Sequence, residues 1–176
     1  MSGHNKWSKI KNKKAVTDAE KSKVFSKFSQ LITVESKKAK GDENSPSLRA
    51  VVERAKKENM PITSIEKAIK KGAGTDAGNL EEVLYEAYGP GGVALIIEGI
   101  TDNKNRSAAE IKHILSKNGL SFAGQGSATW AFEKTHEGWE PKQTTPVGEE
   151  DGEKLEKLIE ELEENDAVQN VFTNAE

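Results

Sequence analysis

The sequence contains no cysteine, which excludes disulfide bonds and thiolate metal sites. Its three histidines, His4, His113 and His136, lie far apart and lack the spacing of a zinc-binding helix. No apolar run approaches the roughly 18 residues that a membrane-spanning helix needs. The first residues are basic, but no apolar segment follows them, so we expect no secretory signal. We therefore expect no metal, no cofactor and no membrane partner.

Arginine is scarce in the part of the chain that carries most of the positive charge. Residues 1–72 hold 18 Lys or Arg against 8 Asp or Glu, and only two of the 18 are Arg. Residues 73–176 hold 8 Lys or Arg against 21 Asp or Glu. The net charge of −3 therefore conceals a basic first part and an acidic second part. Such an asymmetry indicates that the first part contacts a polyanion. Lys is a point charge suited to phosphates, whereas Arg reads guanine edges, so the composition favours backbone contact with folded RNA or nonspecific contact with DNA.

Three amphipathic helices are predicted in this basic part. Capping boxes at 17–20 and 63–66 each precede an apolar periodicity, and Ser45 with Pro46 suits the start of a helix between them. Gly72 is expected to stop the third helix. The helices are predicted over residues 17–40, 45–60 and 63–72.

After a glycine-rich linker at 73–80, the hydrophobic pattern changes to that of an α+β domain. Two alternating segments, 83–88 and 93–100, flank a glycine-rich turn and predict a β-hairpin. A helix capped by Asn105 or Ser107 and a second helix at 149–164 are expected on one face of the sheet. Further strands are predicted at 127–132, 142–147 and 168–173. The predicted fold class is α+β multidomain: a three-helix domain (1–72), then a mostly antiparallel sheet with two helices (81–176).

Lysine is concentrated in the first fourteen residues, around a tryptophan. Such cations neutralise phosphates and release counterions, and an indole among them can stack on an unpaired base, worth roughly 1–3 kcal/mol. The alternative is a solubilising tail whose indole docks on the helical domain. Because the basic excess continues through all three helices, nucleic-acid contact is favoured. The candidate residues are His4, Lys6, Trp7, Lys9, Lys11, Lys13, Lys14, Lys21, Lys23, Lys67, Lys70 and Lys71.

A second candidate contact surface lies in the acidic part. The turn at 89–92 is either a phosphate nest or a plain hairpin turn, and it lacks the lysine and following helix of a P-loop. The polar stretch at 101–106 either binds a ligand or caps a helix. The residues of this surface are Gly89, Pro90, Gly91, Gly92, Asn103, Asn105 and Arg106. We predict no catalytic residue, because neither His4 nor His113 has a recognisable partner.

Six ordered motifs extend over nearly the whole chain. They are Gly3-His4-x-Lys6-Trp7-x-x-Ile10, Asn59-Met60-Pro61, Ile65-Glu66-x-Ala68-Ile69-Lys70-x-Gly72, Tyr85-Glu86-x-Tyr88-Gly89-Pro90-Gly91-Gly92, Thr101-Asp102-Asn103-x-Asn105-Arg106 and Asp166-x-Val168-Gln169-Asn170-Val171. In these motifs the chain resembles the YebC/PmpR family. The resemblance implies a three-helix domain followed by α+β domains. Family members are described as DNA-binding transcriptional regulators, mitochondrial ones are similar to translational activators, and bacterial ones have been tied to ribosomes stalled on proline-rich stretches.

The chain departs from the family pattern at residues 134–141. Family members usually insert a third α+β domain there, whereas this sequence continues directly to a segment that resembles the part after the insertion. Any function of that domain is therefore in doubt.

The predicted function is non-enzymatic regulation of gene expression through nucleic-acid binding. A translation factor that associates with RNA or the ribosome is the first hypothesis, and a DNA-binding transcriptional regulator is the second. A hydrolase is a remote third, because the sequence has no clustered acid–base pair. We expect a cytoplasmic location, or a mitochondrial one for a eukaryotic source, although no transit peptide is visible. The sequence indicates no oligomeric state.

Overall fold

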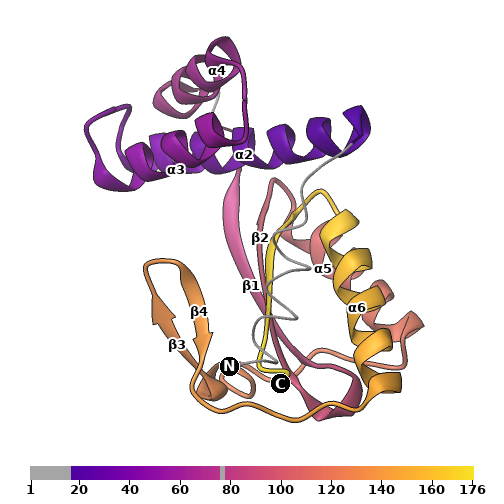
Figure 1. Cartoon of the computed structure of the whole chain (residues 1–176). Coiled ribbons are helices and arrows are strands. Elements are labelled where there is room, and N and C mark those ends of the chain that lie inside the picture. The colour runs from indigo at the N-terminus through magenta and orange to yellow at the C-terminus, as the bar shows by residue number, and fades with distance from the viewer. Residues whose placement is uncertain (1–16, 76–77) are drawn as a thin grey trace. The chain divides into compact units, whose positions relative to one another are not determined.

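The computed structural model describes residues 17–75 and 78–176, whose backbone divides into two compact units (Figure 1). The first unit contains three helices and the second contains sheets and helices, which confirms the predicted α+β fold class. The predicted contact residues of the arm, His4 to Lys14, lie outside the described residues. Within the described ranges, no helix combines the length and apolar character needed to cross a membrane.

The helical unit packs three helices around one apolar core. They are α2 (Asp18–Lys38), α3 (Pro46–Lys57) and α4 (Ile62–Ala73). The predicted capping box of α2 is confirmed: Glu20 N donates to Thr17 Oγ1 (3.1 Å), and Thr17 N donates to Glu20 Oε2 (2.9 Å). The buried residues of the core recur at helical spacing and are Ile32, Leu48, Val51, Ala55, Met60, Ile65, Ala68 and Ile69.

The second predicted capping box, at Thr63, is wrong. Helix α4 begins one residue earlier, at Ile62, and Pro61 occupies the cap position without a side-chain hydrogen bond. The Pro61 carbonyl instead accepts from Ser64 N (3.0 Å) and Ile65 N (3.1 Å). The proline ring presets a backbone angle compatible with the first turn, so the helix starts there without a side-chain cap.

Gly72 allows the close approach of α4 to α2 rather than stopping α4, which continues to Ala73. A Cβ atom at position 72 would lie 2.3 Å from the Thr33 carbonyl oxygen and 2.6 Å from Ser36 Cβ. At this crossing Ser36 Oγ donates to the Ile69 carbonyl at 2.6 Å. Because the obstructing atoms are largely backbone, a side chain at position 72 would push the two helices apart.

Gly72→Ala should therefore destabilise the helical unit, although alanine is the better helix former by about 1 kcal/mol. We expect a loss of about 1–3 kcal/mol in the free energy of unfolding, the usual cost of overpacking. Chemical denaturation followed by far-ultraviolet circular dichroism measures it. The exposed change Lys67→Ala, earlier on the same helix, serves as the control and should stay within about 0.5 kcal/mol. An unfolding free energy that is unchanged or raised in Gly72→Ala would show that the helices separate at no cost.

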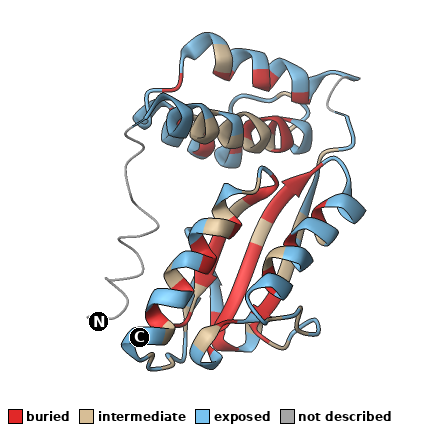
Figure 2. Cartoon of the chain, turned by 90° about the vertical axis from the view of Figure 1, so that its right-hand side faces the viewer, coloured by how far each residue is buried: buried red, intermediate tan, exposed pale blue. Residues whose placement is uncertain are grey.

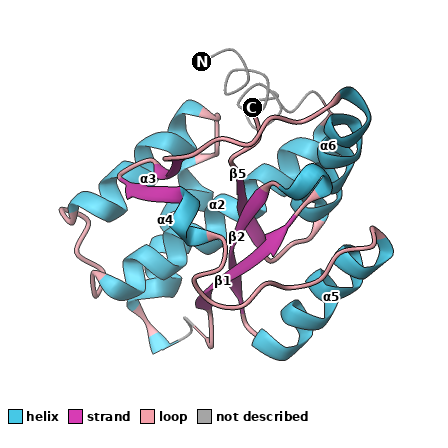
Figure 3. Cartoon of the chain, turned by 90° about the horizontal axis from the view of Figure 1, so that it is seen from below, coloured by secondary structure: helices cyan, strands magenta, loops and turns pink. Residues whose placement is uncertain are grey.

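The α+β unit contains five strands and two helices in the described residues. They are β1 (Glu81–Tyr88), β2 (Ala94–Thr101), α5 (Lys104–Lys117), β3 (Phe132–Thr135), β4 (Gly138–Pro141), α6 (Glu149–Glu164) and β5 (Val168–Thr173). The strands form a three-stranded sheet in the order β1-β2-β5 and a two-stranded sheet of β3 and β4. Helices α5 and α6 lie on one face of the larger sheet (Figures 1 and 3). Short 3₁₀ turns occupy Pro90–Gly92 and Thr129–Ala131.

The central strand β2 is buried on both faces along almost its whole length (Figure 2). Leu95 and Ile97 face the helices, whereas Ala94 and Ile96 face the other way and pack with residues of the β3–β4 hairpin. This alternation follows from the two-residue period of a strand. The hairpin therefore covers the sheet face that the helices leave open.

Two predicted strands of this unit are wrong. Residues 127 and 128 lie in a turn, Thr129–Ala131 form a 3₁₀ turn, and strand β3 starts only at Phe132. The reason is that the Glu86 carboxylate accepts the amides of Ala128 (2.9 Å) and Thr129 (2.8 Å). Those amides are then unavailable to a strand ladder. The strand expected at 142–147 lies earlier, at Gly138–Pro141, and pairs with β3. Only Thr145 of the expected segment pairs, in a single bridge to Ala175.

Candidate nucleic-acid interface

The C-terminal ends of α2 and α4 bring together lysines from two distant stretches of sequence. A Cβ atom at position 72 would lie 3.0 Å from Lys37 N, and one at position 41 would lie 2.7 Å from Ala73 Cβ. The ends of the two helices are therefore in contact. Four exposed lysines are on or next to these contacting residues. We call them the lysine cluster: Lys37, Lys40, Lys70 and Lys71.

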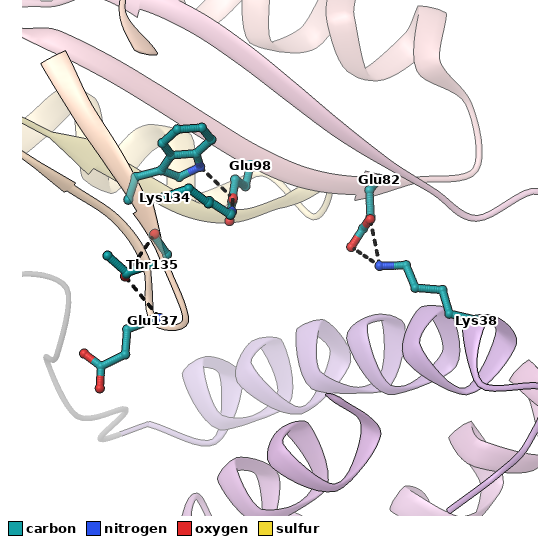
Figure 4. Close-up of polar contacts among 8 residues, drawn as sticks. Lys38, Glu82, Glu98, Lys134, Thr135 and Glu137 are labelled. Carbon is teal, nitrogen blue, oxygen red and sulfur yellow. Dashed lines mark hydrogen bonds and ion pairs between the residues drawn. The ribbon is translucent and has the colours of Figure 1, made fainter. Parts of the chain in front are cut away.

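The lysine cluster differs from its neighbour Lys38 in its ion pairs. Lys38 Nζ lies 2.9 Å from the Glu82 carboxylate (Figure 4). It also lies 3.1 Å from Glu35 Oε1. Partial burial acts to lower the pKa of Lys38, but the hydrogen bonds and charges of the two carboxylates outweigh it and raise that pKa. Among residues 17–75 and 78–176, no carboxylate lies within ion-pair distance of any lysine of the cluster. These four cations are thus available to an external anion.

An ordinary structural role also suits lysines at these positions. Cations in the last turn of a helix offset the partial negative charge of its C-terminus, and each typically stabilises it by about 0.3–1 kcal/mol. Lys37 of α2 and both Lys70 and Lys71 of α4 lie in such turns. A cation can stabilise a helix C-terminus without being exposed and without a second helix end beside it. This role therefore does not explain why four exposed lysines from two helix ends lie together.

The structure does not bring all the predicted cations of the helical unit together. Lys21 and Lys23 lie in the first turns of α2, about 21–24 Å along the helix axis from Lys37 at 1.5 Å per residue. They are instead close in sequence to the arm of residues 1–16. Lys67 lies one turn before Lys70 and Lys71 on the exposed side of α4, and it extends the cluster along that helix.

The glycine turn of the predicted second surface forms a hydrogen-bonded hairpin connection. Gly89 N donates to the Val93 carbonyl (2.8 Å), and Gly92 N donates to the Gly89 carbonyl (3.0 Å). Gly91 has a φ of 76° and lies against Asp151, in the acidic first turn of α6. The nearby carboxylates oppose a phosphate at this turn, so the hairpin role accounts for its residues better.

The polar stretch after β2 is tied to the start of α5. Asn103 N donates to Thr101 Oγ1, and Thr101 Oγ1 donates to the Asn103 carbonyl, both at 3.0 Å. Asn105 and Arg106 lie in the first turn of α5, because the helix begins at Lys104 rather than after the expected cap. Arg106 Nε lies 4.0 Å from Glu110 Oε1 on the exposed side of the helix. Thr101 and Asn103 thus stabilise the entry into α5.

The sequence did not reveal the role of Glu86, which is buried in β1 with 5% of its surface exposed. Its carboxylate accepts hydrogen bonds from the backbone amides of Gly126 (2.7 Å), Ala128 (2.9 Å) and Thr129 (2.8 Å). Burial acts to raise the pKa of Glu86, but these hydrogen bonds to the ionised form outweigh it and lower that pKa. The available signal in the sequence was a glutamate between the aromatic residues of the predicted strand, Tyr85 and Tyr88.

A second, partly exposed link joins the hairpin to the central strand. The Glu98 carboxylate of β2 accepts from Lys134 Nζ (2.8 Å) and Trp139 Nε1 (2.9 Å), as Figure 4 shows for Lys134. Thr135 Oγ1 also closes the hairpin turn by accepting from Glu137 N (3.2 Å). Because Lys134 pairs with Glu98 within the chain, we do not include it among the candidate anion-binding lysines.

Comparison with known proteins places these features in a family. The model of the "TACO1/YebC protein N-terminal domain" matches residues 5–75, and that of the "TACO1/YebC second and third domain" matches 80–137 and 134–175. The chain belongs to the TACO1/YebC family. A "Probable transcriptional regulatory protein" of Fervidobacterium nodosum is 40% identical over 235 residues, covering 99% of this chain and 93% of that protein. A protein of the same name from Thermotoga maritima is 52% identical over 136 residues, covering 76% of this chain and 54% of that protein.

A solved structure has the same fold. The crystal structure of a conserved hypothetical protein from Aquifex aeolicus matches with a TM-score of 0.85 and 31% identity, covering 95% of each chain. The match to the Fervidobacterium relative runs over 235 positions, more than the 176 residues of this chain. The relative therefore carries residues inside the matched span that this TACO1/YebC chain lacks.

Proposed function

We propose that this chain is a non-enzymatic regulator of gene expression that acts by binding RNA, with the ribosome as its site of action. The observation that carries the proposal is the lysine cluster, where two helix ends present four exposed cations without carboxylate partners in the described part of the chain. Lysine contacts of this kind position a protein on a phosphate backbone. The basic arm at residues 1–14 would supply further cations for phosphates.

The second candidate function is DNA-binding transcriptional regulation. The printed names of the relatives from Fervidobacterium and Thermotoga favour it. Duplex DNA also presents phosphates, so the lysine cluster suits both polymers. The near absence of Arg in the basic part argues for RNA or nonspecific binding rather than operator reading.

We further propose that the residues missing relative to longer family members are the third domain. In this chain the segment at that point is the β3–β4 hairpin, which packs on the open sheet face. Binding that requires a third domain would then be lost, and binding through the helical unit would remain.

Sedimentation with ribosomes through a salt series distinguishes the two polymers. We expect co-sedimentation that weakens as salt rises, because released counterions drive the association. Excess duplex promoter DNA should not displace the protein, whereas excess ribosomal RNA should. Protein that stays in the supernatant with ribosomes but binds duplex DNA tightly would refute the RNA proposal in favour of the second function.

A further inference from the structure

Tyr88 and Trp130 are two large aromatic side chains that remain exposed on the α+β unit, by 37% and 52%. Trp130 Nε1 donates a hydrogen bond to Tyr88 Oη (3.2 Å), and Tyr88 Oη donates to the Ser127 carbonyl. The polar atoms of both side chains are therefore satisfied within the protein. What the pair offers to solvent is aromatic ring surface.

The backbone that carries Trp130 is held in place by hydrogen bonds to the buried Glu86 carboxylate. Glu86 fixes the amides of Gly126, Ala128 and Thr129, and the alanines on either side of the indole, Ala128 and Ala131, are completely buried. The indole thus projects from a short turn anchored at both ends. An aromatic side chain held in this way loses little conformational entropy when a planar ligand stacks on it.

The pair lies on the less acidic side of its unit. Ala87 packs under the helices, so its neighbours Glu86 and Tyr88 point to the opposite face of the sheet. Helix α6, which holds nine of the 21 acidic residues after position 72, covers the helical face instead. On the side of the aromatic pair, Lys142 N donates to the Ala131 carbonyl (2.7 Å), which places the exposed Lys142 beside the turn that carries Trp130.

We propose that Tyr88 and Trp130 form a stacking platform for an unpaired base of single-stranded RNA, with Lys142 close to the adjoining phosphate. The inference rests on the proposed RNA-binding function and names a second contact for it. Stacking needs only a ring face, whereas a bound peptide segment usually requires a donor for its carbonyls, and the indole N–H here is already used. Glu133 and Glu140 face each other across the same hairpin and would repel further phosphates, so the site takes one or two nucleotides.

Replacing the indole tests this platform. Trp130→Leu keeps an apolar side chain but removes the ring, and we expect it to weaken binding of a fluorescently labelled, unstructured oligoadenosine about 5- to 150-fold in an anisotropy titration. Trp130→Phe should lose less, because a smaller ring remains. The salt dependence should stay unchanged in both variants, since no phosphate contact is removed. The control is Leu84→Ala, which removes an exposed apolar side chain from β1, the strand that carries Tyr88. This variant should bind the oligonucleotide as the wild type does.

A fluorescence readout separates stacking from a merely structural effect. Oligoadenosine should quench the tryptophan emission of the wild type, and that quenching should decrease in Trp130→Phe, while thermal melting confirms that all variants are folded. Equal RNA binding by the wild type and Trp130→Leu would overturn the platform and leave the proposed function standing. A wild type that binds no RNA would overturn both. Quenching by a proline-rich or lysine-rich peptide but by no oligonucleotide would assign the surface to a protein partner and refute the platform.

Discussion

Exchanging the four lysines of the cluster for glutamine should weaken RNA binding on the order of 100-fold at low salt. Lys37, Lys40, Lys70 and Lys71 lie on two helix ends that contact each other, so one stretch of backbone can reach all of them. Each phosphate contact on a single strand contributes about 0.7 to the slope of log affinity against log salt concentration. The slope should therefore become shallower by up to about 3 units. Anisotropy titrations at several salt concentrations measure both effects.

The matched control carries the same change of charge elsewhere in the chain. Lys112, Lys117, Lys154 and Lys157 are exposed on α5 and α6, and their joint replacement by glutamine also removes four positive charges. We expect this control to bind RNA with the affinity and salt slope of the wild type, because its lysines lie on the acidic unit. Equal loss in both variants would mean that net charge alone drives the binding.

The arm can be compared with the cluster in the same assay. Neutralising Lys6, Lys9, Lys11 and Lys13 should also weaken binding and reduce the salt slope. If the arm variant loses affinity and the cluster variant does not, the helical unit only supports the arm, and the cluster is not a contact. Losses that add in the combined variant would show that the two sets of lysines contact phosphates independently.

The sequence predicted those elements whose own residues determine them. The capping box at Thr17 and the leucine periodicity of α6 are local signals, and the predicted final strand agrees with the observed Val168–Thr173. The turn at 127–132 could not be predicted locally. Its apolar and aromatic residues are typical of a strand. The amides that a strand would use instead donate hydrogen bonds to the carboxylate of Glu86, which is distant in sequence.

The candidate site was predictable in composition but not in arrangement. The excess of lysine identified the helical unit as the basic one, yet residues 37–40 and 70–71 meet only because Gly72 lets α4 approach α2. A glycine that stops a helix and one that permits close packing look the same in a sequence. For the same reason Trp130 could not be recognised as exposed, since its exposure depends on how Glu86 anchors the turn.

Glu86→Ala should cause the largest loss of stability of any single change proposed for this chain. It leaves the amides of Gly126, Ala128 and Thr129 without their acceptor, and each buried unpaired amide costs about 1–3 kcal/mol. Because solvent can reach part of the turn after the change, we expect a total loss of about 3–5 kcal/mol in the free energy of unfolding. Urea denaturation followed by tryptophan fluorescence measures it. Glu133→Ala, on the exposed hairpin, is the control and should change stability by less than about 0.5 kcal/mol.

The same carboxylate predicts how stability depends on pH. The amide hydrogen bonds lower the pKa of Glu86 in the folded protein below its unfolded value. The ionised carboxylate therefore stabilises the fold fully above the unfolded pKa, and this contribution is lost as the pH falls through the folded pKa. Glu86→Gln removes the titrating group while keeping one carbonyl acceptor. The stability difference between wild type and Glu86→Gln should therefore be large at neutral pH and shrink as the pH falls through that range. A difference that stays constant down to the acid limit of folding would show that Glu86 acts through its shape and not through its charge.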